Sequence, residues 1–182
     1  GVAAASLQGT TQNDIVKEYL SRGTYVFPPL ASLRLTSDVV AYTVDAVPRW
    51  NPINICSYHL QEAGATPVQE IAFAMANAIA VLDSVRSRPS LSEQALPRVF
   101  GRLSFFLNAG IRFVEETCKC RAMAQLWEEI GRERYGIRDE TMLRFLPHPD
   151  LVIYLRASTS TLLGRIARRG RDYERTISPD YI

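Results

Sequence analysis

The sequence Asn-Ile-Cys-Ser-Tyr-His-Leu-Gln-Glu-Ala-Gly-Ala at residues 54–65 decides the fold class, because a short apolar run ends abruptly in polar groups. We interpret residues 53–57 as a strand that runs into a loop. In α/β proteins the ligand-contacting side chains gather at the carboxyl ends of strands. Tyr58, His59 and Glu62 are therefore candidate binding residues. Without these neighbours, His59 would more simply be an imidazole satisfied within the fold.

Helical patterns follow this strand. Thr66-Pro67 supplies a cap and a first helical residue for a helix over residues 68–86, which is apolar on most sides and so is predicted to be buried. A second strand over residues 102–108 has a continuous apolar middle. A long helix from about residue 111 to residue 134 comes next and ends at Gly136.

Two helices are predicted before the strand. The first begins near Ile15 and stops at Gly23, and the second begins at Ser32 and ends before Pro48. The order helix, helix, strand, helix, strand, helix leaves connections that suit only parallel strands. The pattern predicts an α/β fold, and the segment is too short for a closed barrel of about 250 residues. We therefore expect a partial TIM barrel.

Composition excludes several classes. The net charge of +2 is too small for a general nucleic-acid surface, which needs a sustained basic stripe. The 3 cysteines form no zinc-type pair and no disulfide framework, so we expect no metal site and a cytoplasmic, reducing location. No run reads as a membrane span, and we expect no membrane partner.

Four blocks of sequence occur in a fixed order and carry a resemblance. They are Gly9-Thr10-x-Gln12-Asn13-Asp14-Ile15-x-Lys17-Glu18-Tyr19, Tyr25-x-x-Pro28-Pro29, Tyr58-His59-x-x-Glu62-Ala63-Gly64 and Arg102-Leu103-Ser104-Phe105-Phe106-x-Asn108. Residues 7–145 thereby resemble the adenosylcobalamin-dependent acyl-CoA mutases, and among them most closely methylmalonyl-CoA mutase. The resemblance implies part of a substrate-binding TIM barrel, adenosylcobalamin as cofactor, and radical isomerisation of methylmalonyl-CoA to succinyl-CoA.

The resemblance also assigns roles in binding and catalysis. His59 matches the family's hydrogen-bond donor to the thioester carbonyl, and Gln12 matches its partner. Arg22 stands where the family binds a substrate carboxylate, which favours a dicarboxylic acyl-CoA. Tyr58 matches a catalytic residue at the substrate face, and Glu62 matches a contact to the adenosyl group of the cofactor.

The last block contributes to substrate binding by the same resemblance. Arg102 and Ser104 match positions that hold the CoA moiety, and Phe106 matches an aromatic wall of the cavity. One departure concerns the loop itself: Ser57 stands where the family commonly has glycine. Because glycine tolerates unusual backbone angles, we expect Ser57 to strain the loop that aims His59.

The tail carries a different resemblance. Pro147-x-Pro149-Asp150-Leu151-Val152-Ile153-Tyr154-Leu155 and the later Arg165, Arg169 and Arg171 are similar to the C-terminal part of a deoxynucleoside kinase, whose arginines close over phosphates. A basic helix face is the plain alternative. The sequence has no Gly-x-x-x-x-Gly-Lys-Ser/Thr loop to hold those phosphates.

These observations give one leading hypothesis. Residues 1–145 form a partial acyl-CoA mutase barrel and residues 146–182 form a kinase-like strand-helix unit, so the chain is a hybrid or fragment. It binds an acyl-CoA, is inactive alone, and needs a missing mutase subunit or cobalamin-binding chain. Whether it is an enzyme by itself stays open. The alternatives are a deoxynucleoside kinase-type phosphotransferase and a non-enzymatic module that binds partners through open sheet edges.

Overall fold

The computed structural model describes residues 1–89, 91–143, 160, 161, 163, 164 and 168. Its elements, in order, are η1 (Ala4–Ser6), β1 (Gly9–Thr10), α1 (Ile15–Lys17), the π-helical turn η2 (Glu18–Arg22), α2 (Pro29–Ala46), β2 (Trp50–Asn51), β3 (Asn54–Cys56), α3 (Tyr58–Glu62), α4 (Pro67–Arg86), η3 (Glu93–Ala95), α5 (Leu96–Phe100), β4 (Ser104–Phe106), α6 (Phe113–Glu133) and α7 (Glu140–Leu143). Helices and parallel strands alternate, as the sequence predicted for an α/β fold.

The strands form two parallel pairs. β3 lies beside β4 with Cys56 opposite Phe106, so the carboxyl ends of both strands open at the same edge. β1 pairs with β2 in the same way. The second strand is shorter than the predicted 102–108. The β1–β2 pair was not predicted, because two residues are too few to show an alternating pattern.

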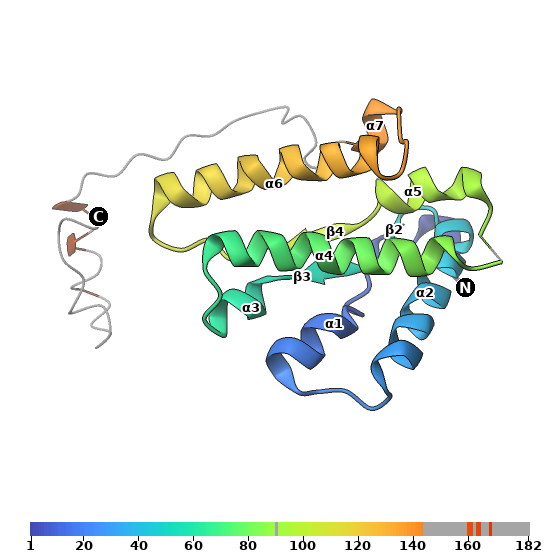
Figure 1. The fold of residues 1–182 in the computed structure, drawn as a ribbon, viewed down its shortest axis with the longest axis horizontal. Helices are drawn as coiled ribbons and strands as arrows, with labels where there is room; N and C mark the ends of the chain where they lie inside the picture. The colour runs from blue at the N-terminus through green and yellow to red at the C-terminus, as the bar shows by residue number, and fades with distance from the viewer. Residues whose placement is uncertain (90, 144–159, 162, 165–167, 169–182) are drawn as a thin grey trace.

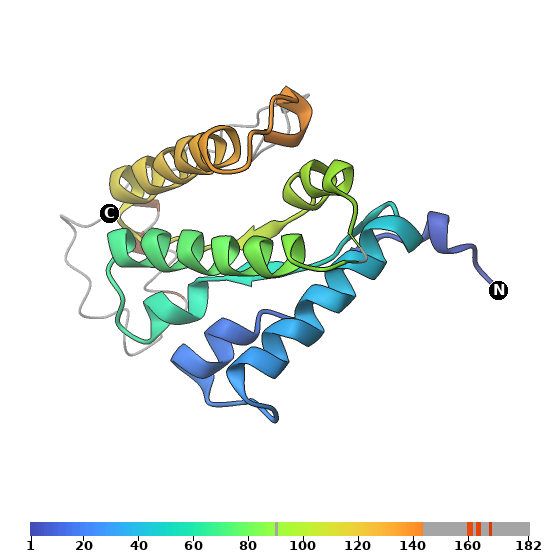
Figure 2. The same cartoon turned by 45° about the vertical axis from the view of Figure 1, so that its right-hand side comes forward.

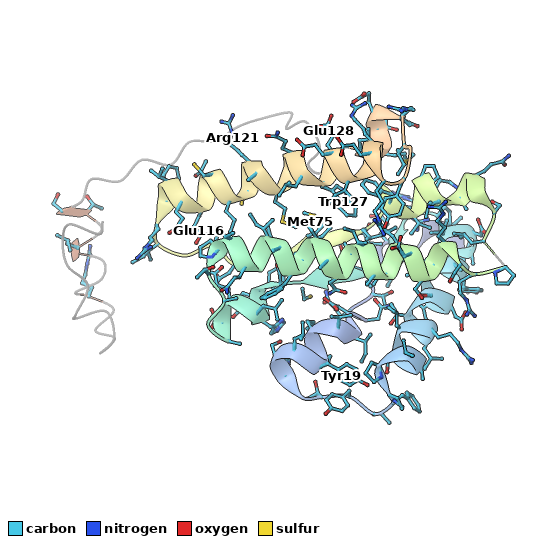
Figure 3. The ribbon with its side chains drawn as sticks, viewed as in Figure 1. Tyr19, Met75, Glu116, Arg121, Trp127 and Glu128 are labelled. Carbon is cyan, nitrogen blue, oxygen red and sulfur yellow. The ribbon has the colours of Figure 1, made fainter. Side chains whose placement is uncertain are left out.

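Three long helices lie side by side in the order α2, α4, α6, and the strands run behind them (Figures 1 and 2). The core fills the space between these helices and the strands. Trp127 of α6 stacks on Phe100 of α5 with ring centroids 3.9 Å apart. Figure 3 shows Trp127 and Met75 between α6 and α4, while Arg121 and Glu128 point away from the body. The arrangement matches an arc of a barrel with helices outside.

Local chemistry sets the helix boundaries. Thr66 and Gln69 form a capping box at the start of α4, and Pro67 occupies the first turn, so this predicted helix is confirmed. Gly23 ends η2 with φ of 66°, a conformation that glycine adopts at little cost. The predicted start of α2 at Ser32 was wrong by three residues. Pro29 itself begins the helix, since a proline at the first helical position forfeits no hydrogen bond.

Two expectations about the central loop were wrong. Residues 58–62 are not a loop but the short helix α3, which begins directly after β3. Ser57 causes no strain either, because its φ of −83° and ψ of −16° lie in the ordinary helical region. A glycine is therefore not required there.

Helix α4 also corrects the expectation that no segment could span a membrane. Its 20 residues are long and apolar enough by composition alone, but half of its most apolar window is buried within the fold. A helix buried in the core of a folded domain passes the same test. The predicted strand at residues 151–155, most of the helix predicted after it, and Arg165, Arg169 and Arg171 lie outside the described residues.

Candidate functional site

An aromatic cluster lies where β3 and β4 end. Tyr58 stacks on Phe106 with centroids 5.2 Å apart, and it meets the His59 ring edge-on at 5.0 Å. The parallel register causes this contact, since Tyr58 follows β3 by two residues and Phe106 ends β4. Phe106 remains 49% exposed. The structure thus brings three predicted site residues together and leaves their outer surface open to a ligand.

Arg22 reaches the same cluster from the end of η2. Its Nη1 lies 3.3 Å from Nε2 of His59. A guanidinium can only donate, so Nε2 accepts and the ring proton of neutral His59 is on Nδ1. Nδ1 is buried and has no hydrogen-bond partner among the described residues. Burial first, and then the charges of Lys17 and Arg22, lower the pKa of His59, so the imidazole is neutral at pH 7.

Gln12 and Ser104 contact the same strand rather than His59. The Gln12 side-chain oxygen accepts from Nδ2 of Asn54 at 3.1 Å and lies 3.4 Å from the Cys56 thiol. The Ser104 hydroxyl lies 3.0 Å from the carbonyl of Ile53 and 3.2 Å from Oδ1 of Asn54. Both residues therefore fix the polar side of β3, directly before the aromatic cluster.

Glu62 lies at the end of α3, and its carboxylate accepts from Nδ2 of Asn108 at 3.2 Å. Asn108 follows β4 by two residues, so this hydrogen bond joins the segments after both strands. The carboxylate is exposed on the same edge as Phe106 and has further acceptor capacity.

Arg102 lies away from the cluster. Its guanidinium donates to the backbone carbonyls of Val44 at 3.1 Å, Val47 at 2.6 Å and Trp50. These carbonyls lie at the end of α2 and just after it, and Arg102 precedes β4. Four residues of strand span about 13 Å, which separates Arg102 from Phe106. The guanidinium therefore holds the α2–β2 connection in this structure.

Residues that the sequence did not single out support the site from behind. Glu70 and Lys119 form an ion pair of 2.7 Å and are 0% and 4% exposed. The helical periodicity of the sequence could have identified both residues. Glu70 heads the buried stripe of Ala74 and Ala78 in α4, and Lys119 heads a similar stripe in α6, so each charge occupies a position that periodicity assigns to the core.

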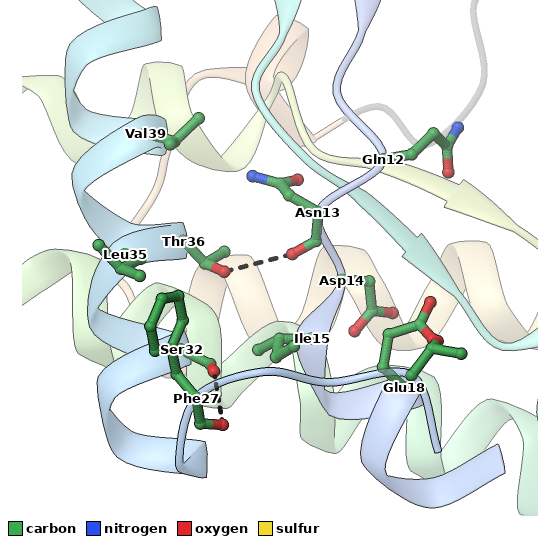
Figure 4. A pocket seen from close by; sticks show the side chains of 11 residues that line it. Gln12, Asn13, Asp14, Ile15, Glu18, Phe27, Ser32, Leu35, Thr36 and Val39 are labelled. Carbon is green, nitrogen blue, oxygen red and sulfur yellow. Dashed lines mark hydrogen bonds between the residues drawn. The ribbon is translucent and has the colours of Figure 1, made fainter. Parts of the chain in front are cut away.

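A hollow of about 400 Å³ lies between α1 and α2 and includes Gln12 and Asp14 in its wall. Figure 4 shows the Thr36 hydroxyl donating to the Asn13 carbonyl across it. The wall contains none of the aromatic cluster. No group of three or more metal-binding side chains occurs within residues 1–89 and 91–143 or among the few later residues described.

The parallel strands, the helices packed on them and the polar groups at the strand ends form an α/β arrangement that is consistent with a partial barrel, in which Arg22 lies beside His59. A sequence model of the methylmalonyl-CoA mutase family matches residues 1–151. The chain belongs to this family of acyl-CoA mutases, whose members depend on cobalamin.

Individual relatives agree. The chain is similar to ethylmalonyl-CoA mutase of Methylorubrum extorquens, with 67% identity over 76% of the chain and 20% of the relative. Ethylmalonyl-CoA mutase of Cereibacter sphaeroides is 59% identical over 80% of the chain and 22% of the relative. Methylmalonyl-CoA mutase of Rhizobium meliloti is 43% identical over 73% of the chain and 18% of the relative.

Two consequences follow for the sequence predictions. The chain spans about a fifth of the length of the curated relatives that it matches. The resemblance to methylmalonyl-CoA mutase identified the family correctly, but the two ethylmalonyl-CoA mutases are more similar to the chain than the methylmalonyl-CoA mutase of Rhizobium meliloti is. The kinase resemblance of residues 146–182 has no support in these matches, since the family model ends at residue 151.

Proposed function

We propose that this chain is the substrate-binding segment of an ethylmalonyl-CoA mutase. The observation that carries the proposal is the difference in identity: 67% and 59% to two ethylmalonyl-CoA mutases against 43% to a methylmalonyl-CoA mutase. Arg22 agrees with this choice, because ethylmalonyl-CoA carries a free carboxylate that a guanidinium binds well. Methylmalonyl-CoA carries the same carboxylate and is the nearest competing substrate.

The Arg22–His59 contact suggests how the two groups act on such a substrate. When Arg22 turns to the carboxylate, Nε2 of His59 loses its donor. The neutral ring can then carry its proton on Nε2 and donate to the thioester carbonyl, which polarises that carbonyl. Tyr58 and Phe106 supply an apolar wall beside it, and such a wall excludes water and protects a reactive intermediate from side reactions.

The exposed edge also fits the cofactor that the family uses. Glu62 is exposed there, and its carboxylate has acceptor capacity for ribose hydroxyl groups beyond its hydrogen bond from Asn108. Adenosylcobalamin, when bound, supplies the radical that starts the rearrangement. In this proposal Glu62 binds and orients the cofactor, Arg22 and His59 bind the substrate, and Phe106 forms part of the wall beside the substrate.

We propose that the described residues bind the acyl-CoA, and that turnover also needs the part of the mutase that binds cobalamin, on which this family depends. We also propose a cytoplasmic location. All three cysteines are free, and free thiols persist in a reducing compartment.

Calorimetric titration tests the proposal. The purified chain is titrated with ethylmalonyl-CoA, methylmalonyl-CoA and butyryl-CoA, the last of which lacks the free carboxylate. We expect ethylmalonyl-CoA to bind most tightly, methylmalonyl-CoA less tightly and butyryl-CoA least. The one methylene that distinguishes the first two ligands should change the affinity roughly 10-fold. The Arg22→Gln variant should bind ethylmalonyl-CoA and butyryl-CoA equally.

Arg121→Gln is the matched control, since Arg121 points away from the body on α6 (Figure 3). This variant should keep the order of the wild-type chain. Tighter binding of methylmalonyl-CoA than of ethylmalonyl-CoA would refute the substrate assignment. An unchanged preference in Arg22→Gln would refute the role of Arg22.

A further inference from the structure

A buried ion pair lies directly behind the candidate site. Glu70 of α4 and Lys119 of α6 meet at 2.7 Å, and Glu116 lies beside Lys119 as a second carboxylate. Burial opposes the charge on Lys119, but the carboxylates of Glu116 and Glu70 outweigh it and raise the pKa of this lysine. The ammonium group therefore stays charged inside the protein.

Both members of the pair contact the segments that carry the site residues. The Glu70 carboxylate accepts from the Ser57 hydroxyl at 3.2 Å and from the backbone N–H of Asn108 at 2.8 Å. Lys119 donates to the carbonyl of Asn108 at 2.6 Å and to the side chain of Gln61 at 3.1 Å. Ser57 precedes Tyr58, Gln61 precedes Glu62, and Asn108 follows Phe106 by two residues.

These contacts suit orientation better than stability. Burial of two charges carries a desolvation penalty that an apolar pair of the same volume would avoid. An apolar pair, however, could not form hydrogen bonds with the backbone N–H and carbonyl of Asn108 or with the hydroxyl of Ser57. Such groups need polar partners when water is excluded. The ion pair meets this need for both strand-end segments at once.

We propose that Glu70 and Lys119 are positioning residues, which hold the first turn of α3 and the segment after β4 so that Tyr58, His59 and Glu62 face the substrate. This inference rests on the proposed function for its meaning in catalysis. Ser57 takes part in the same network, because its hydroxyl donates a hydrogen bond from the start of α3 to Glu70.

The pKa of the His59 ring can be used to detect a change in the position of α3. The chain has only 2 histidines, so the His59 C–H resonance is assigned by its absence in a His59→Gln variant. Charged groups that act on His59 are Lys17, Arg22, Glu18 and Asp14, all from the segment before α2. Glu70 and Lys119 carry opposite charges, so their joint removal leaves the net charge unchanged.

The experiment measures the His59 pKa by proton NMR in the ligand-free chain. The double variant Glu70→Gln/Lys119→Met keeps the side-chain volumes and removes both charges. A loosened α3 lets the ring reach water and move away from Arg22, so the pKa of His59 should rise toward its ordinary value. Ser57→Ala removes one hydrogen bond and should raise the pKa less.

Asp83→Asn is the control on the same helix, because Asp83 pairs with Arg134 and Tyr135 rather than with the site segments. It should lower the melting temperature without moving the His59 pKa. Far-UV circular dichroism establishes that each variant is folded. If the double variant unfolds, Ser57→Ala decides the question alone.

Folded variants whose His59 pKa equals that of the wild-type chain would overturn the inference, and so would an equal rise in Asp83→Asn. The NMR titration needs no ligand. If the wild-type chain fails to bind ethylmalonyl-CoA, the proposed function fails, while the role of the ion pair in positioning α3 is still decided by the ligand-free resonance.

Discussion

The guanidinium of Arg22 and the imidazole of His59 lie in contact, with Nη1 3.3 Å from Nε2, although the two residues are 37 positions apart. The contact joins the end of η2 to the first turn of α3. It fixes the neutral tautomer of His59 with the proton on Nδ1. Arg22 also lies 3.9 Å from Glu18 in the same turn, so the guanidinium has a carboxylate partner when no ligand is present.

Replacement of Arg22 by glutamine should raise the pKa of His59. The positive charge of Arg22 lowers this pKa, after burial and Lys17, so its removal favours the protonated ring. Proton NMR titration of the His59 resonance measures the change. Arg121→Gln, on the outer face of α6, should leave the titration unaltered. A His59 pKa that falls in Arg22→Gln would disprove the contact in solution.

The stability of the fold should depend on the protonation of His59. The folded pKa is lowered, so between this value and the unfolded pKa near 6.5 the unfolded chain binds more protons. The contribution of His59 is therefore fully present above about pH 6.5 and is lost as the pH falls through the folded pKa. Urea unfolding at pH 7.5 and 5.5 measures it. His59→Gln should show a smaller loss of stability on acidification than the wild-type chain, and an equal or larger loss would contradict the assignment.

Replacement of Asp14 by asparagine should destabilise the chain. The buried carboxylate accepts from the N–H groups of Cys56 at 2.8 Å and Lys17 at 3.2 Å and from the Asn77 amide at 2.8 Å. An asparagine NH₂ group would face at least one of these donors and leave it unsatisfied, at a cost of about 1–3 kcal/mol. Urea unfolding provides the measurement.

Asp45→Asn is the matched control for Asp14. Asp45 pairs with Arg98 at 2.9 Å on the surface, where an ion pair contributes about 0–1 kcal/mol. Equal effects of the two substitutions would argue against the buried role of Asp14.

Replacement of Gly131 by alanine should destabilise the chain, although alanine normally favours a helix. An added Cβ would lie 2.5 Å from Cδ2 of Leu143 and 2.8 Å from Cζ of Phe100. Overpacking of this kind costs about 1–3 kcal/mol, against a gain in helix propensity of about 1 kcal/mol. Thermal unfolding tests the sign. Glu128→Ala, on the exposed face of α6, should leave the melting temperature nearly unchanged; a higher melting temperature for Gly131→Ala would refute the close packing.

The helices were predictable where capping and periodicity agree. Thr66 and Pro67 mark the start of α4, and the apolar pattern carries it to Arg86, so both ends follow from local chemistry. The α3 turn was not predictable. Five residues provide too little periodicity, and the turn is held by the contact of Ser57 with Glu70, which is remote in sequence.

The candidate site was also predictable only in part from the sequence. The Tyr58-His59-x-x-Glu62 sequence and Arg22 pointed to the acyl-CoA mutases, and the family match confirms that membership. The individual roles of these residues stay predictions. The resemblance placed Arg102 at the CoA moiety. In this structure its guanidinium instead donates hydrogen bonds to the carbonyls of Val44, Val47 and Trp50.

By itself the sequence determined the α/β class, the parallel direction of the two predicted strands, the long helices and the family, because these depend on periodicity, capping, connection lengths and residue types at fixed spacing. Only the tertiary structure decided that Arg22 meets His59, that Tyr58 stacks on Phe106, and that Glu70 and Lys119 join the segments after both strands. Side chains distant in sequence meet only when helices and strands pack, and the register of β3 against β4 fixes which of them do.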